Sequence, residues 1–288
     1  MTPRARPMLI GAALCAVAFL FLLAMVYSDP AGRWIDAAAL QGLVSLQSPG
    51  LDWIVTAIAH LGDALPLLLL TVALVSCALV LRRPREAAAA LAVIAAANVT
   101  TQILKPLLAF TRDGVEVASV FIGAAAFPSG HATASMSFAI AAIIVTSAGL
   151  RPIAAACGAV FALAVSLSLV ILGWHYPSDV VGGYLVATGW GFLALAALRE
   201  ADARWPERTG REAARRALAE NARARSVLAG VGLATIGLAA LAGVVALIKL
   251  PALLAYAAAH TTAAIVAPAV VLSAAALLVS FAAISSRR

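Results

Sequence analysis

Charged residues are scarce in this chain of 288 residues. Asp, Glu, Lys and Arg make up 11% of it, whereas hydrophobic residues make up 64%. Soluble domains contain roughly 25% charged and about 45–50% apolar residues, so the composition excludes an ordinary water-soluble domain. A net charge of +7 would favour nucleic-acid binding in a soluble protein, but here the basic residues flank apolar runs, where they set membrane orientation. We therefore expect no nucleic-acid partner.

The sequence also lacks the alternating segments of about 10 residues that a transmembrane β-barrel needs. Its apolar runs are unbroken and about 20 residues long, which is the length of a helix that crosses a bilayer. Only helices and closed barrels satisfy their backbone groups in lipid. The predicted fold class is therefore all-α, a polytopic membrane helical bundle.

Patterns that hold metals or disulfides are missing as well. The three cysteines, Cys15, Cys77 and Cys157, lie inside apolar runs without CxxC spacing, so we interpret them as small core residues. No pair of histidines has His-x3-His spacing, which disfavours a zinc or haem site. We expect no metal and no cofactor.

Eight membrane-spanning helices are predicted. The first follows a basic start, as a secretory signal does, but its apolar run exceeds the roughly 7–15 residues of a signal peptide, so we interpret it as a retained anchor. The predicted spans lie near residues 8–27, 63–81, 87–105, 131–149, 153–173, 179–198, 226–248 and 262–284.

The distribution of Lys and Arg predicts the orientation. Of the 20 basic residues, only Arg33, Lys105, Arg112 and Lys249 fall on the face opposite the termini. Basic residues concentrate on the cytoplasmic side of membrane proteins. We therefore expect a multi-pass protein of the plasma (bacterial inner) membrane with both termini in the cytoplasm. The four histidines all lie at or near the extracytoplasmic face.

Composition divides the chain into three units. Residues 1–200 form a six-helix body, in which amphipathic stretches at 34–46 and 51–61 are expected to lie along the outer interface. Residues 201–225 form a charged cytoplasmic connector. Residues 226–288 add two transmembrane helices without ionisable residues in their cores, so helices 226–284 are candidates for contact with a partner protein of the envelope.

Three polar segments interrupt the apolar pattern at the extracytoplasmic ends of the helices. The first carries two cations seven positions apart, Lys105 and Arg112. Taken alone, such a pair commonly extends to the membrane interface without any catalytic role. The second, Phe127–His131, opens a helix whose free N–H groups form a ready anion site. The third, Gly173–Asp179, has a His and an Asp four positions apart, so the carboxylate can orient the imidazole.

The predicted topology brings these segments to one face. Cations and N–H donors can hold phosphoryl oxygens there, while one histidine attacks phosphorus and another protonates the leaving oxygen. The inventory therefore favours phosphoryl transfer. His60 and His260 lie outside these segments, and we expect both to act as interfacial anchors rather than in catalysis.

The segments resemble the pattern of the type 2 phosphatidic acid phosphatase (PAP2) family, which is Lys-x6-Arg-Pro, Pro-Ser-Gly-His and Ser-Arg-x5-His-x3-Asp. The resemblance covers roughly residues 50–200 and implies a membrane lipid phosphatase that needs no metal. It implies His175 as the nucleophile, Asp179 as its orienting partner and His131 as the general acid. The matching phosphate-binding residues are Lys105, Arg112, Ser129 and Gly130.

Two positions depart from the family pattern. Asp113 stands in place of the first Pro, and Leu169, directly after Ser168, stands in place of the second Arg. Loss of that Arg removes a bidentate phosphate ligand that Lys cannot replace geometrically. The leading hypothesis is a phosphatase or pyrophosphatase that hydrolyses a lipid-linked phosphate monoester or diphosphate on the extracytoplasmic face, through the phosphohistidine intermediate that the resemblance implies. Two alternatives are a lipid phosphotransferase with the same intermediate and a weakened member that binds or transports lipid.

Overall fold

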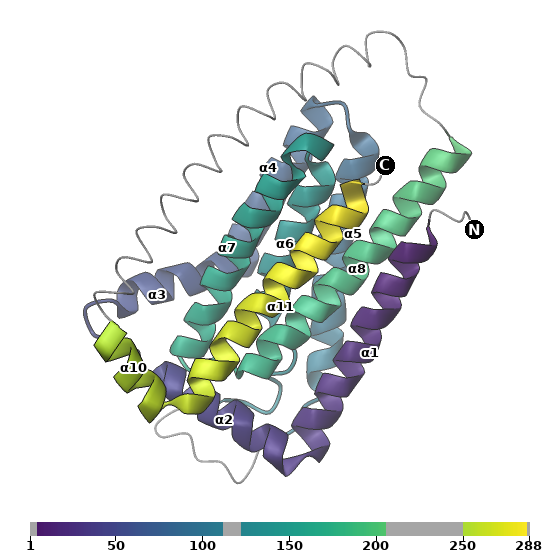
Figure 1. Cartoon of the computed structure of the whole chain (residues 1–288). Helices are drawn as coiled ribbons and strands as arrows, with labels where there is room; N and C mark the ends of the chain where they lie inside the picture. Colours follow the sequence, from purple (N-terminus) through teal and green to yellow (C-terminus); the bar gives the residue numbers. More distant parts are fainter. Residues whose placement is uncertain (1–4, 112–121, 206–249, 287–288) are drawn as a thin grey trace.

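The computed structural model describes residues 5–111, 122–205 and 250–286 (Figure 1). These ranges contain helices, turns and loops without a strand, which confirms the all-α prediction. The α-helices are α1 (Arg6–Ser28), α2 (Pro30–Val44), α3 (Asp52–Ala59), α4 (Ala64–Val80), α5 (Pro84–Leu107), α6 (Gly130–Val145), α7 (Arg151–Ile171), α8 (Pro177–Arg204), α10 (Leu250–Ala259) and α11 (Thr261–Ser286), with short 3-10 helices η1 (His60–Gly62) and η2 (Ala148–Leu150).

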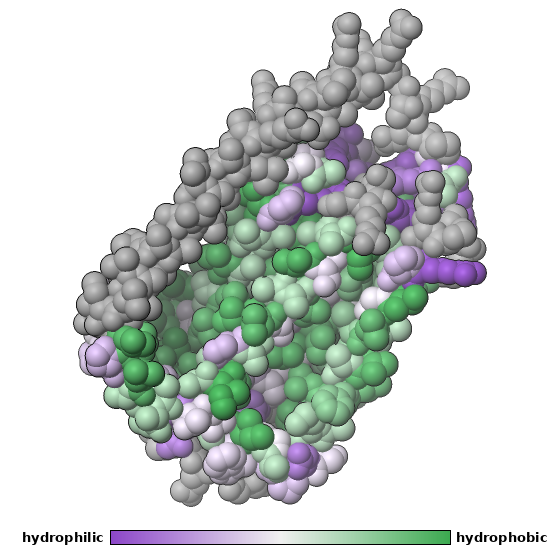
Figure 2. Space-filling view, in the orientation of Figure 1, coloured by the Kyte–Doolittle hydropathy of each residue, from purple (hydrophilic) through white to green (hydrophobic). Residues whose placement is uncertain are grey.

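Five helical segments of the described ranges are long and apolar enough to cross a bilayer. They are α1, α5, η2 with α7, α8 and α11; α3–η1 and α4 pass the same test only as a pair bent by 58°. Figure 2 shows a broad hydrophobic band over these helices, with hydrophilic residues gathered toward its ends. The protein is thus a multi-pass membrane protein. The helix predicted at 226–248 lies outside the described residues.

Helix boundaries differ most from the prediction at two places. The helix expected over 131–149 ends at Val145, because Thr146 and Ser147 adopt extended backbone and are weak helix formers. The helix expected over 179–198 continues to Arg204, because the residues that follow are mostly Ala, Arg and Glu, which favour helix. The amphipathic stretches at 34–46 and 51–61 form α2 and α3–η1, too short to span, at one end of the bundle beside α10 (Figure 1).

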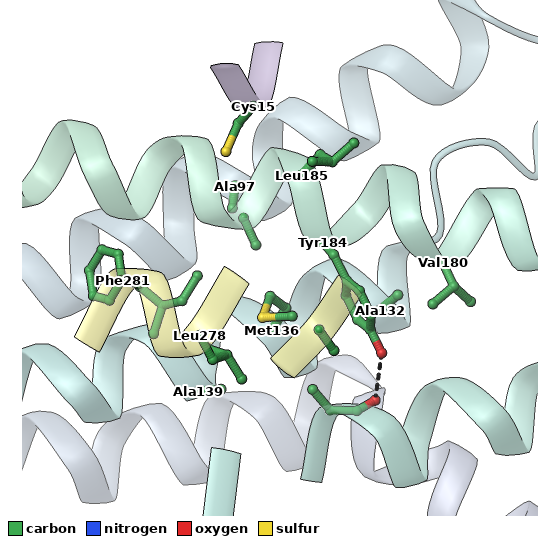
Figure 3. Close-up of a cluster of buried hydrophobic side chains, with 14 of the residues drawn as sticks. Cys15, Ala97, Ala132, Met136, Ala139, Val180, Tyr184, Leu185, Leu278 and Phe281 are labelled. Carbon is green, nitrogen blue, oxygen red and sulfur yellow. Dashed lines mark hydrogen bonds between the residues drawn. The ribbon is translucent and has the colours of Figure 1, made fainter. Parts of the chain in front are cut away.

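Helix α6 forms the centre of the bundle. It packs against α4, α5, α7, α8 and α11, and most of its residues are buried. Small side chains permit this close packing: a Cβ added to Gly158 of α7 would lie 2.7 Å from the Ala139 Cβ of α6. Figure 3 shows Met136 of α6 among side chains of neighbouring helices. It also shows Tyr184 of α8, whose hydroxyl donates to the Ala162 carbonyl of α7 at 3.2 Å.

Helix α11 is built into this bundle. It packs against α2, α7 and α8, and its Phe281 ring lies 5.4 Å from the ring of Phe192, centroid to centroid. The buried guanidinium groups of Arg151 and Arg199 donate to the carbonyl of Ser285 in the last turn of α11. Cations are favourable at a helix C-terminus, where carbonyls lack partners. The domain boundaries at residues 200 and 226 stay predictions.

Candidate active site at the N-termini of α6 and α8

The start of α6 supplies an anion-binding terminus. Ser129 is the N-cap residue, and its hydroxyl oxygen accepts from the Ala132 N–H at 3.4 Å. The Thr133 hydroxyl donates to the Ser129 carbonyl at 2.8 Å, which ties the first turn together. The first turn of a helix presents N–H groups without intrahelical partners, and the helix dipole places positive charge there. Gly130 and His131 begin this turn, as the sequence predicts.

The turn between α7 and α8 positions the second histidine. Gly173 adopts φ 73°, a left-handed conformation that favours glycine. The N–H of Gly173 donates to the Val170 carbonyl at 3.0 Å, and that of Trp174 donates to the Leu169 carbonyl at 2.9 Å. This pair of bonds is a Schellman motif, which ends α7 and reverses the chain. His175 therefore follows directly at the end of the bundle.

His175 and Asp179 form the predicted pair. His175 Nδ1 lies 3.3 Å from Asp179 Oδ2, which also accepts from the Tyr176 N–H at 3.0 Å. Asp179 is fully buried and His175 is 8% exposed. A carboxylate that accepts from Nδ1 fixes the tautomer and leaves Nε2 as the ring nitrogen with a free lone pair. A histidine in this arrangement can act as a nucleophile through Nε2.

A backbone hydrogen bond joins the two helix starts. The Ser129 N–H donates to the Asp179 carbonyl at 2.9 Å. Two glycines of α8 permit the approach: a Cβ on Gly182 would meet the Phe127 ring at 2.8 Å, and one on Gly183 would meet the Ser129 carbonyl oxygen at 2.7 Å. The Phe127–His131 and Gly173–Asp179 segments thus form one site, as expected.

Lys105 reaches this site from the last turn of α5. A Cβ on Gly130 would lie 3.8 Å from Lys105 Nζ, so the ammonium lies beside the start of α6. Lys105 also interacts electrostatically with Asp179, and His131 does so with both Lys105 and His175. One cation, two histidines and one carboxylate are therefore brought together. The other predicted cation, Arg112, lies outside the described residues.

Leu169 fills its position with an apolar contact. It is fully buried and clusters with Ala59 of α3 and Val165 of α7. The partly buried Ile58 and Phe161 pack against this cluster. The side chain at position 169 therefore holds α3 against α7 in this protein.

The structure adds two residues to the site that sequence reasoning did not assign to it. His131 Nε2 lies 2.7 Å from Asp63 Oδ1, and His60 Nδ1 lies 2.8 Å from Asp63 Oδ2. Burial alone would raise the pKa of the Asp63 carboxyl, but hydrogen bonds and charges from His131 and His60 hold that pKa below its ordinary value. Asp63 is thus a carboxylate near neutral pH.

A cleft of about 450 Å³ opens beside these groups. Asp63, Lys105 and His131 line it together with apolar side chains of α4 and α5, which include Leu67, Leu68, Leu91 and Ile94. The cleft therefore joins a polar end at the candidate site to an apolar wall among the spanning helices.

Residues 86–202 match the family model of the PAP2 superfamily. This part of the chain belongs to the PAP2 superfamily. The PAP2 region contains Lys105, His131, His175 and Asp179, whereas Asp63 precedes it. No curated protein matches the chain.

A solved structure shares the fold. It is described as the first transmembrane PAP2 type phosphatidylglycerolphosphate phosphatase from Bacillus subtilis. The similarity covers 69% of this chain and 99% of that chain, with 23% sequence identity and a TM-score of 0.56. The PAP2 region thus lies within a bundle of known architecture.

Other polar residues near the helix ends serve different contacts. Asp36 of α2 accepts from both the N–H and the hydroxyl of Ser178, which attaches the start of α8 to α2. His260 lies apart from the site, with Nε2 3.3 Å from the Ser45 hydroxyl. Within the described residues, no group of three or more His, Cys, Asp or Glu side chains is arranged to hold a metal ion.

Proposed function

We propose that the protein removes phosphate from a lipid-linked phosphate monoester or diphosphate through a phosphohistidine on His175. The observation that carries the proposal is the pairing of His175 Nδ1 with buried Asp179, directly beside the N-terminus of α6. An oriented imidazole next to an anion-binding helix start is suited to attack on phosphorus. The PAP2 region supports the same reaction class.

The first step forms a bond between His175 Nε2 and phosphorus while the bond from phosphorus to the leaving oxygen breaks. His131, in its protonated form, gives its proton to that oxygen. In the second step His131 takes a proton from water, whose oxygen attacks phosphorus and releases His175. Asp179 stabilises the positive charge that develops on His175 when the N–P bond forms.

Phosphate binding is assigned to Lys105, Arg112, Ser129 and the backbone of Gly130. The ammonium of Lys105 beside the start of α6 supports this assignment, because a cation and helix N–H donors together stabilise the phosphoryl oxygens. Arg112 follows seven positions after Lys105 and is assigned on that spacing.

A lipid substrate agrees with the shape of the cleft. The polar end of the cleft contains Lys105 and His131, and the rest of its wall is apolar. The cleft therefore suits a substrate whose phosphate lies in water and whose hydrocarbon chain lies in lipid. Isoprenyl diphosphates, phosphatidate and phosphatidylglycerol phosphate have this form. We assign the site to the extracytoplasmic face because the sequence pattern predicts most Lys and Arg residues on the opposite, cytoplasmic face.

The test is phosphate release by the purified full-length protein in detergent with EDTA present, using these three lipids. We expect release by the wild type and its loss in His175→Ala. His260→Ala is the matched control, since it removes a histidine near the same end of the bundle but outside the site, and it should keep wild-type release. No release from any lipid by folded wild-type protein contradicts hydrolysis. Release that appears only with an added lipid or sugar alcohol favours a phosphotransferase.

A further inference from the structure

The PAP2 pattern provides the nucleophile with a carboxylate partner, Asp179, but leaves the general acid without one. In this protein the bend between α3 and α4 supplies a second carboxylate. Asp63 lies at that bend and contacts His131 Nε2 at 2.7 Å, shorter than the 3.3 Å between His175 and Asp179. His175 and His131 therefore each contact a different carboxylate.

We propose that Asp63 is a positioning residue for His131, which fixes its ring orientation and stabilises its protonated form, and that His60 holds the Asp63 carboxylate in place. The proposal rests on the proposed function, because it concerns the proton that His131 exchanges with the leaving oxygen. In this role Asp63 acts through His131 and takes no direct part in phosphoryl transfer.

The local charge explains why His131 requires a carboxylate partner. Burial is the largest effect that disfavours the protonated form of His131. Lys105 of α5 and His175 before α8 add to this effect, because a positive charge on either opposes protonation. A general acid must carry its proton at the working pH. Asp63 is a carboxylate in contact with His131, and its hydrogen bond and negative charge act against these effects.

The hydrogen-bond geometry also selects which nitrogen acts. Asp63 Oδ1 accepts from His131 Nε2, so Nδ1 is the nitrogen left to exchange a proton with the substrate. The other oxygen, Oδ2, is bonded to His60 Nδ1 at 2.8 Å, so the carboxylate is held from both sides. The indole of Trp174 packs near both histidine rings, at centroid distances of 5.6 Å and 6.3 Å.

The surrounding packing fixes this chain of groups relative to the site. Leu169 and Ala59 hold the end of α3 against α7, and His60 follows Ala59 directly. Gly62 lies against the ring of His131, since a Cβ there would be 2.9 Å from His131 Cδ2. The apolar residue at position 169 therefore helps to hold in place the segment that contains His60 and Asp63.

The test compares two phosphate esters that differ in their need for a general acid. Decyl phosphate releases an alcohol that must be protonated, whereas 4-nitrophenyl phosphate releases a stable anion. For Asp63→Asn in the full-length protein we expect kcat/KM to fall ~10- to 100-fold with decyl phosphate and less than ~3-fold with 4-nitrophenyl phosphate. The alkaline limb of the decyl phosphate profile should move to lower pH, because the protonated His131 loses its stabilising charge.

Asp52→Asn is the matched control. It makes the same substitution at the start of α3, where Asp52 accepts from the Ser48 N–H rather than from a histidine. We expect both esters to be hydrolysed as by the wild type. Equal losses with both esters in Asp63→Asn would overturn the proposal, because impaired folding affects both substrates alike. No loss with decyl phosphate would overturn it as well. If the wild type hydrolyses neither ester, or does so without His175, it is the proposed function that fails.

Discussion

At the residue scale, Leu169 illustrates how a departure from a family pattern acquires a structural meaning. From the sequence alone it is a missing phosphate ligand. In the structure it is fully buried and packs against Ala59, so the position faces α3. The same residue that replaces the family Arg thus provides the apolar contact between α3 and α7. The sequence could not reveal it, because Ala59 and Leu169 are 110 positions apart.

Restoring the family arginine should accordingly be harmful. We expect Leu169→Arg to lower the melting temperature in detergent and reduce phosphate release, because an unpaired buried guanidinium costs several kcal/mol. Leu169→Met, which conserves volume, should cost less than ~1.5 kcal/mol and keep activity. A stable Leu169→Arg protein that releases phosphate faster than the wild type would show instead that position 169 is open to phosphate.

At the scale of elements, the site depends on how closely α8 approaches the start of α6. A Cβ on Gly183 would lie 2.7 Å from the Ser129 carbonyl oxygen, so Gly183→Ala must move α8 or the N-cap of α6. A displacement of about 1 Å can lower a catalytic rate ~10²-fold. We expect a loss of that order in kcat for lipid phosphate hydrolysis.

Gly189→Ala, six residues further along α8, is the matched control. An added Cβ there meets Cys15 Cβ at 3.6 Å, which is ordinary contact. Alanine favours helix over glycine by up to ~1 kcal/mol, so this variant should be as stable as the wild type or more so, with unchanged activity. Equal activity in both variants would mean that the approach of α8 to α6 does not position the site.

Prediction from sequence works well for elements whose signal is local. Long apolar runs identify α1, α5, α7, α8 and α11, and the four-residue spacing of His175 and Asp179 predicts their contact. The role of Asp63 is not local. It depends on the 58° bend before α4, which brings Asp63 beside a histidine 68 positions later.

At the scale of the whole molecule, the ends of the bundle differ. The start of α1 and the end of α11 lie at one end in Figure 1, and α2, α3 and α10 lie at the other, where the site is. The concentration of Lys and Arg predicts that the first end faces the cytoplasm. This predicted orientation rests on the distribution of Lys and Arg along the sequence and not on how the helices pack.

Cysteine labelling of intact cells can test the orientation. In a protein without its three native cysteines, we expect Gly50→Cys, in the loop between α2 and α3, to react with a membrane-impermeant maleimide. A Cβ at Gly50 has no neighbour within 4 Å, so the substitution should be tolerated. Ala203→Cys, exposed near the end of α8, should react only after the cells are permeabilised. The reverse labelling pattern would mean that the site faces the cytoplasm.

The central claim is that His175 becomes phosphorylated during turnover. The most direct measurement mixes the full-length protein with a lipid carrying radiolabelled phosphate, quenches the reaction in alkaline denaturant and maps the labelled peptide. We predict a label on His175 that is stable in alkali and lost in acid, and its absence from His175→Ala. Phosphate release at the wild-type rate with no label on His175 would contradict the account.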